Sequence, residues 1–287
     1  MKKHTVVGKL TNIRLAYPDF LVSKNRTVRI WTPKEYRFNS HTPYDVIYAL
    51  DGQNLFDSAT SFIGREWEID ETIEAKKKEA GIRPAVVVGL DNSADRLSEY
   101  FPRLSSTAIG TLGYKAEITF AFLLNAVIPY VEEHYNVRKD KEGRSFLGSS
   151  MGGLMAIAAA LKYNKIFGNI YAFSPSFTMY KYGMEEIPPV REAVGNNSTV
   201  RKTVQSLCKP SVMNSTRLIL ESGGVGQYEH EGLKNVRYMY KAMLKNGWDE
   251  SHLALFTYPE DEHNEDQWNE AFYDAYQWMH DIKKEKE

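Results

Sequence analysis

Residues 143–156 decide the fold, and they read Gly143-Arg144-Ser145-Phe146-Leu147-Gly148-Ser149-Ser150-Met151-Gly152-Gly153-Leu154-Met155-Ala156. Within them, Gly148-x-Ser150-x-Gly152 matches the nucleophile-elbow pattern, in which a serine stands at a tight strand-to-helix turn. Glycines two positions before and after the serine leave that turn free of bulk. An apolar run enters the turn, and a run of small residues at 156–161 leaves it. The stretch therefore predicts that Ser150 is a nucleophile at the end of a buried strand.

Strand and helix patterns alternate along the rest of the chain. Polar and apolar residues roughly alternate at 10–17 and 27–32, as in half-buried antiparallel strands. Nearly continuous apolar runs at 45–50 and 84–90 are typical of strands buried on both faces. Further strands are expected at 144–147, 170–173, 217–221 and 252–258, and helices at 67–80, 116–135, 151–164, 233–246 and 266–284. This order predicts an α/β fold whose mostly parallel central sheet has an antiparallel N-terminal edge and helices on both faces.

The size of the chain fits a single domain. A chain of 287 residues can bury a full core, so one domain over residues 1–287 is expected. Residues 177–215 are less regular and rich in turn residues, and we expect a cap-like excursion there. A homodimer is expected because dimers are the commonest oligomers, and no feature of the sequence is the basis for it.

Composition and charge exclude several classes of partner. The net charge is −1 and no long basic block occurs, which argues against nucleic acid. The N-terminus lacks the apolar core of a signal peptide. The sequence also contains no run of about 18 apolar residues, so no membrane-spanning helix is expected. The single cysteine, Cys208, suits a reducing compartment. We therefore expect a cytoplasmic protein that associates with neither nucleic acid nor membrane.

A nucleophilic serine needs a base within hydrogen-bond reach and an acid that orients this base. On the elbow fold these follow in the order serine, acid, histidine. Of the seven histidines, His263 lies in a loop just after the last expected strand, where the active sites of parallel sheets form. His263 is therefore the predicted base.

Three glutamates compete for the role of the acid. They follow or end the strand expected at 217–221, and the loop after it is expected to extend to residue 231. Glu229 follows a glycine-rich bend from which a side chain can turn back toward His263. Glu231 can instead begin the next helix, and Glu221 still belongs to the strand. Glu229 is favoured, with Glu231 and Glu221 as alternatives.

Two backbone amides must stabilise the developing oxyanion. One is expected from Met151, the residue after the nucleophile, and the other from the loop that follows residue 50. There Gln53 is favoured, with Asn54 next. Asn54, Trp67, Arg96 and Tyr100 are candidate substrate-binding residues, although core packing and solvated charge are the ordinary roles of such side chains.

Several ordered motifs together resemble a known family. They are residues 48–57 (Tyr-Ala-Leu-Asp-Gly-Gln-Asn-Leu-Phe-Asp), 88–92 (Val-Gly-Leu-Asp-Asn), 99–102 (Glu-Tyr-Phe-Pro), 148–153 and His263-Asn264-Glu265 before Trp268. Over roughly residues 25 to 285 the chain resembles the putative esterase (esterase D-like) family of α/β-hydrolases. That family includes enterochelin esterases, feruloyl and acetyl-xylan esterases and S-formylglutathione hydrolases.

The resemblance implies an α/β-hydrolase fold and a Ser-acid-His hydrolase, with Ser150 and His263 on matching positions. Such relatives often carry Gly-Thr-x-Glu or Gly-Thr-x-Asp after the seventh strand, whereas this chain has the longer Gly-Gly-Val-Gly-Gln-Tyr-Glu. The expected activity is hydrolysis of small-molecule carboxylic esters through an acyl-enzyme, with no metal and no cofactor. Acyl transfer to a sugar or another alcohol, and a catalytically inactive binding module, are the alternatives.

Overall fold

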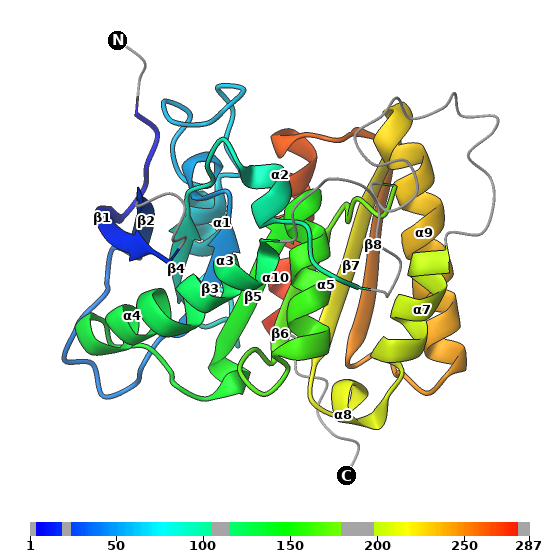
Figure 1. Ribbon diagram of the computed structural model, residues 1–287. Helices are drawn as coiled ribbons and strands as arrows, with labels where there is room; N and C mark the ends of the chain where they lie inside the picture. The colour runs from blue at the N-terminus through cyan, green and yellow to red at the C-terminus, as the bar shows by residue number, and fades with distance from the viewer. Residues whose placement is uncertain (1–3, 19–23, 105–114, 179–197, 281–287) are drawn as a thin grey trace.

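A computed structural model describes residues 4–18, 24–104, 115–178 and 198–280 (Figure 1). Its strands are β1 (Lys9–Tyr17), β2 (Lys24–Thr32), β3 (Asp45–Leu50), β4 (Ala85–Leu90), β5 (Arg144–Ser149), β6 (Asn169–Phe173), β7 (Arg217–Val225) and β8 (Leu253–Glu262). Its helices are α1 (Ile69–Lys76), α2 (Arg96–Glu99), α3 (Ala116–Phe122), α4 (Ile128–His134), α5 (Met151–Lys162), α7 (Ser198–Leu207), α8 (Pro210–Met213), α9 (Gly226–Lys245) and α10 (Glu265–His280), with the shorter η1 (Gly52–Asn54), η2 (Leu123–Val127) and η3 (Lys141–Gly143).

The strands form one sheet in the order β1-β2-β4-β3-β5-β6-β7-β8. Strand β2 pairs antiparallel with both β1 and β4, and every later pair in this order is parallel. The carboxyl ends of β3 to β8 therefore meet at one edge of the sheet, where α/β proteins carry their sites. The predicted fold class, a mostly parallel sheet with an antiparallel N-terminal edge, is confirmed.

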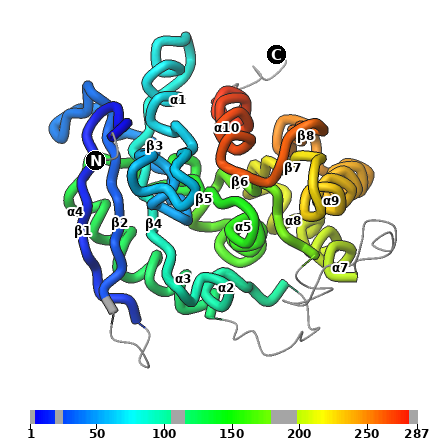
Figure 2. Tube along the Cα trace, turned by 90° about the horizontal axis from the view of Figure 1, so that it is seen from above, coloured from blue at the N-terminus to red at the C-terminus, as the bar shows by residue number. Residues whose placement is uncertain are grey.

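Helices cover both faces of this sheet (Figure 2). Side chains alternate along β3: Val46, Tyr48 and Leu50 belong to one core, and Ile47 and Ala49 to the other. The first core is closed by apolar residues of α3, α4, α5, α7 and α9, and the second by those of α1 and α10. Because β3 is buried on both faces, its apolar run is nearly continuous, as expected for a central parallel strand.

The two strands nearest the C-terminus are longer than the sequence indicates. The loop expected at 222–231 was therefore wrong, and the loop that carries His263 begins only after Glu262. Strand β7 continues to Val225 and pairs with β8 as far as Glu262, across an irregularity after Gly223. A Cβ atom on Gly224 would lie 2.3 Å from the carbonyl oxygen of Pro259. The glycines at 223–224 thus permit the backbones of β7 and β8 to approach closely, which is a common role of glycine within strands.

These extensions decide where the candidate residues stand. Helix α9 begins at Gly226, so Glu229 lies in its first turn and not in a loop. His263 follows directly after β8 and precedes α10. The two residues therefore come from neighbouring parallel strands at the same edge of the sheet.

Helices elsewhere also differ from the expected ranges. The helix expected at 116–135 is divided by the π-helical η2, and the one at 67–80 is the shorter α1. In the excursion, α7 packs against α9 and α5. Residues 179–197 lie outside the described residues, so the cap stays a prediction. Among the described helices, none combines the length and apolar character that crossing a bilayer requires.

Candidate active site

Ser150 occupies a strained turn between β5 and α5. Its φ and ψ are 58° and −120°, a combination that costs free energy for any residue with a side chain. The backbone N–H of Ser150 donates to the carbonyl oxygen of Phe173, 3.0 Å away on neighbouring β6. The turn thus holds the serine at the carboxyl edge of the sheet, directly before the N-terminus of α5.

The glycines around Ser150 are not equally required. A Cβ atom on Gly148 would lie 2.4 Å from the carbonyl oxygen of Gly152, and one on Gly153 would lie 2.5 Å from that of Phe173. At Gly152 the nearest atoms, in Leu50, are 3.6 Å away, which is ordinary contact. The expectation that the turn needs glycine on both sides of the serine therefore holds for Gly148, while Gly153, and not Gly152, is the second glycine without space for a side chain.

His263 is bound to one of the three candidate acids. Its Nδ1 atom lies 2.8 Å from Oε1 of Glu229, whose side chain is only 1% exposed. The Glu229 carboxylate also accepts hydrogen bonds from Ser174 at 2.5 Å and Ser222 at 2.6 Å. Burial alone would raise the pKa of Glu229, but the hydrogen bond and charge of His263, with the two serines, lower it below its ordinary value. Glu229 is thus built to remain an anion beside the imidazole.

The other two acids stand differently. Glu221 lies inside β7 and is fully buried; it accepts a hydrogen bond from Gln267, and its Oε2 atom lies 3.4 Å from the Ser174 hydroxyl. Glu231 lies in the second turn of α9 and is also buried. Of the three, Glu229 is the one whose hydrogen bond to His263 the structure contains.

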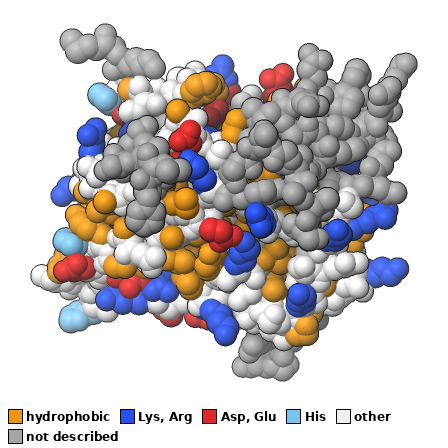
Figure 3. All heavy atoms as spheres, viewed as in Figure 1, with side chains coloured by type: hydrophobic (Ala, Val, Ile, Leu, Met, Phe, Trp, Pro, Cys, Tyr) orange, Lys and Arg blue, Asp and Glu red, His pale blue; other side chains and the backbone are white. Residues whose placement is uncertain are grey.

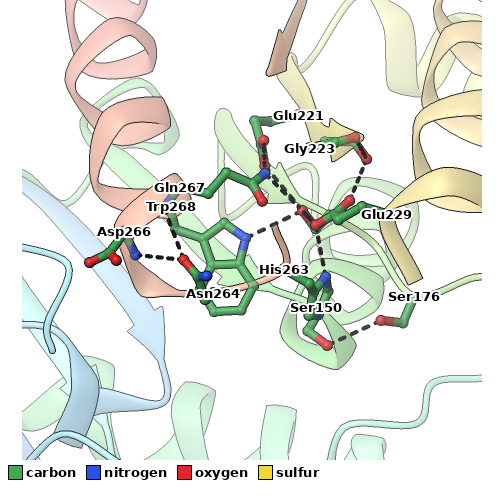
Figure 4. Close-up of polar contacts among 12 residues, drawn as sticks. Ser150, Ser176, Glu221, Gly223, Glu229, His263, Asn264, Asp266, Gln267 and Trp268 are labelled. Carbon is green, nitrogen blue, oxygen red and sulfur yellow. Dashed lines mark hydrogen bonds and ion pairs between the residues drawn. The ribbon is translucent and has the colours of Figure 1, made fainter. Parts of the chain in front are cut away.

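Figure 4 shows the ring of His263 between the Glu229 carboxylate and the side chain of Ser150 in that view. The ring packs edge-on against Trp268, with centroids 5.1 Å apart, and lies 5.7 Å from the ring of Tyr228. The Ser150 hydroxyl lies 3.1 Å from that of Ser176. In this arrangement the serine hydroxyl has a second serine as its hydrogen-bond partner.

The candidate oxyanion amides come from two elements. Met151 is the first residue of α5, so its N–H points out of the helix N-terminus, where the dipole favours negative charge. In η1, the Asn54 N–H donates to Asp51 at 2.9 Å, whereas within the described chain the Gln53 N–H has no backbone acceptor. This difference favours Gln53 over Asn54 as the second donor.

The candidate substrate-binding residues are mostly held by other groups. Trp67 is 2% exposed and stacks on Phe173 with centroids 5.7 Å apart. Tyr100 is equally buried, and its hydroxyl accepts a hydrogen bond from the Asp51 amide. Arg96 donates two hydrogen bonds of 2.7 Å to the Asp51 carboxylate and remains 26% exposed. The amide of Asn54 donates to Glu265. Trp67 and Tyr100 are thus packed in the interior, and the four substrate-binding roles stay predictions.

Sequence reasoning missed the serines that surround the triad candidates. Ser174 and Ser176 follow β6, and Ser222 lies near the end of β7. A signal was available, since Ser174-Pro175-Ser176 closes a parallel strand next to the one that carries Ser150.

A separate group of carboxylates has oxygens within 4.8 Å of one another and is the one such group found among the described residues: Glu66, Asp70 and Glu71. It contacts the N-terminal segment through the Val7 N–H, 2.7 Å from Asp70.

Comparisons with known proteins agree with this fold. Residues 21–279 match the family model described as "Putative esterase". An uncharacterized protein of Bacillus subtilis, YbbA, is 26% identical over 269 residues, 89% of this chain and 93% of that protein. The ferri-bacillibactin esterase BesA of the same organism is 28% identical over 169 residues, 54% of this chain and 55% of that protein. The solved structure of an IroE-like serine hydrolase from Shewanella oneidensis aligns with a TM-score of 0.70 at 16% identity, covering 94% of this chain and 79% of the other.

Proposed function

The chain belongs to the family described as "Putative esterase" and is a carboxylic-ester hydrolase of the α/β-hydrolase fold, and from this premise we propose that Ser150, His263 and Glu229 are its catalytic triad. The observation that carries the proposal is the 2.8 Å contact between His263 Nδ1 and the buried carboxylate of Glu229. It is supported by the strained turn that presents Ser150 at the same edge of the sheet.

The proposed mechanism follows from these contacts. With Nδ1–H donated to Glu229, the free Nε2 atom of His263 is the base that takes the proton of Ser150 as its oxygen attacks the ester carbonyl. The N–H groups of Met151 and Gln53 stabilise the tetrahedral oxyanion. His263 then protonates the leaving alcohol, and an acyl-enzyme remains on Ser150. Water, activated by the same imidazole, releases the carboxylic acid and restores the serine.

Substitution of the nucleophile tests the proposal. Ser150→Ala should lower turnover of p-nitrophenyl butyrate by about 10⁴- to 10⁶-fold, because no oxygen remains to form the acyl-enzyme. A fluorophosphonate probe should label the wild type and fail to label the variant. Ser145→Ala, which removes a buried hydroxyl near the opposite end of β5, is the matched control. Undiminished hydrolysis in folded Ser150→Ala would remove Ser150 from this role.

The acyl group is the next question for experiment. A panel of nitrophenyl esters, acetylated sugars, hydroxycinnamate esters and catecholate siderophores would rank the substrates by kcat/KM. Including an alcohol acceptor beside water in the same assay separates hydrolysis from acyl transfer.

A further inference from the structure

Ser174 joins the proposed triad to a second buried acid. Its hydroxyl oxygen lies 2.5 Å from Glu229, 3.3 Å from the Trp268 indole nitrogen, 3.3 Å from Gln267 Nε2 and 3.4 Å from Glu221. Its backbone N–H donates to the carbonyl oxygen of Glu221 at 2.8 Å, and its φ is 40°. A serine held in this unfavourable conformation is fixed by its surroundings.

Glu221 is the second acid, and it lies in the interior of the sheet. Its side chain is completely buried, and the titratable groups that face it are Glu229 from α9 and Tyr258 from β8. Burial, reinforced by the negative charge of Glu229, raises the pKa of Glu221 well above its ordinary value. The pKa values of the two buried acids are thus shifted in opposite directions, that of Glu221 toward the neutral acid and that of Glu229 toward the anion.

The hydrogen-bond donors and acceptors around Ser174 fit a neutral Glu221 beside an ionised Glu229. A serine hydroxyl has one proton to donate and two lone pairs to accept with. Ser174 gives its proton to Glu229, the shortest of its contacts, and its lone pairs face the N–H groups of Trp268 and Gln267. The second amide proton of Gln267 goes to Glu221. If Glu221 were ionised, two carboxylates would compete for the single proton of Ser174.

We propose that Ser174 and Glu221 are positioning residues that fix the Glu229 carboxylate against His263. Donors that polarise Ser174 strengthen its bond to Glu229, since hydrogen bonds in a chain are cooperative. Ser222 binds the other carboxylate oxygen at 2.6 Å, so both oxygens of Glu229 are held. The inference rests on the proposed triad and adds the groups that orient its acid.

Kinetics of three variants test the inference. Ser174→Ala should lower kcat for p-nitrophenyl butyrate by about 10- to 100-fold, the range for losing one hydrogen bond to a charged group, with KM changed less than about twofold. Glu221→Leu should lower kcat similarly, because Gln267 loses its acceptor. Glu221→Gln keeps a neutral side chain of the same shape, so its kcat should stay within about threefold of the wild type.

The pH profile tests the neutrality of Glu221 independently. If Glu221 is neutral, Glu221→Gln removes no charge and leaves the acidic limb of the kcat/KM profile at its wild-type pH. If the midpoint of this limb in Glu221→Gln differs from that of the wild type by about one pH unit or more, the substitution has removed a charge, and the inference is overturned.

Controls separate the possible failures. Ser145→Ala should match the wild type, and thermal melts verify that each variant is folded. If Glu221→Leu does not fold, Ser174→Ala and Glu221→Gln still decide the question. Wild-type kcat in folded Ser174→Ala overturns this inference alone, whereas full activity in Ser150→Ala or Glu229→Gln overturns the proposed triad itself.

Discussion

Glu229 and Glu231 are two positions apart on the same helix, yet only Glu229 is hydrogen-bonded to His263 in the described structure. Glu229→Gln should lower kcat by about 10³- to 10⁴-fold, because an amide at this position favours the wrong tautomer of the imidazole. Glu231→Gln removes a charge outside that contact and should cost less than about 10-fold. Both variants are to be compared by ester hydrolysis at one pH, and the opposite ranking would assign the acid to Glu231.

Individual site residues could be predicted from the sequence where the chemistry or the turn geometry restricts the residue type. A nucleophile elbow admits few sequences, so the glycine spacing, together with the apolar run before it and the helical run after it, predicts Ser150 as the nucleophile. The acid could not be located, because any of three nearby glutamates can turn toward His263 until the backbone is known. For Ser174 and Ser176 the sequence offered only their place after a strand next to the one that carries Ser150, and Ser222 has no distinguishing pattern, since serine is common in turns and near strand ends.

Among the elements, the β5–α5 turn makes unequal demands on its glycines. Gly148→Ala and Gly153→Ala should each destabilise the fold by about 1–3 kcal/mol or more, because their new Cβ atoms would meet backbone oxygens. Gly152→Ala meets ordinary contact distances and should stay within about 1 kcal/mol of the wild type. Urea denaturation of the three variants measures the difference. Equal losses at all three positions would contradict the steric account.

Helix α9 allows stability and activity to be separated. A Cβ atom on Gly232 would lie 3.1 Å from the Ser222 hydroxyl and 3.3 Å from Glu229 Oε2. Gly232→Ala gains up to about 1 kcal/mol of helix propensity, but it displaces the groups that orient His263. We expect kcat to fall about 10-fold or more while the melting temperature does not decrease. A loss of both would indicate general overpacking and not a specific displacement of Glu229.

The lengths of β7 and β8 show what the sequence hides at the scale of elements. Glycines at 223–224 and acids at 260–262 are typical of loops, and both segments are strands. Pairing between β7 and β8 extends both strands, and the glycines let their backbones approach. Local composition reports average preferences, whereas this extension depends on which strands become neighbours. By contrast, β3 and β4 could be predicted from their apolar runs, because a strand that is buried on both faces requires apolar residues at nearly every position.

Over the whole molecule, charge is distributed without a dominant sign. On the face drawn in Figure 3, basic and acidic side chains of the described residues are interspersed with apolar ones, in keeping with the net charge of −1. Carboxyl groups are concentrated instead inside, where Glu66, Asp70 and Glu71 meet the N-terminal segment. Thr5 donates to Glu66, the Val7 N–H donates to Asp70, and the Trp31 indole donates to the Val7 carbonyl. The first described residues are thereby attached to β2, to the segment that precedes α1 and to the first turn of α1.

This internal cluster should make the stability of the whole protein fall as pH rises. Burial and the neighbouring Glu71 raise the pKa of Asp70 to about 9, and burial raises the pKa of Glu66 to about 7. Between the ordinary values of 3.8 and 4.5 and these raised values, the folded state binds more protons than the unfolded state, so unfolding becomes easier as pH increases.

Asp70→Asn tests this dependence, because an amide keeps the acceptor for the Val7 N–H and has no proton to lose. The melting temperature of Asp70→Asn relative to the wild type should therefore increase from about pH 5 to about pH 9. Glu260→Gln, at an exposed acid of β8, is the control, and its difference from the wild type should stay constant. A constant or decreasing difference for Asp70→Asn would mean that Asp70 is ionised in the folded protein, and that the N-terminal segment is held by a charged group.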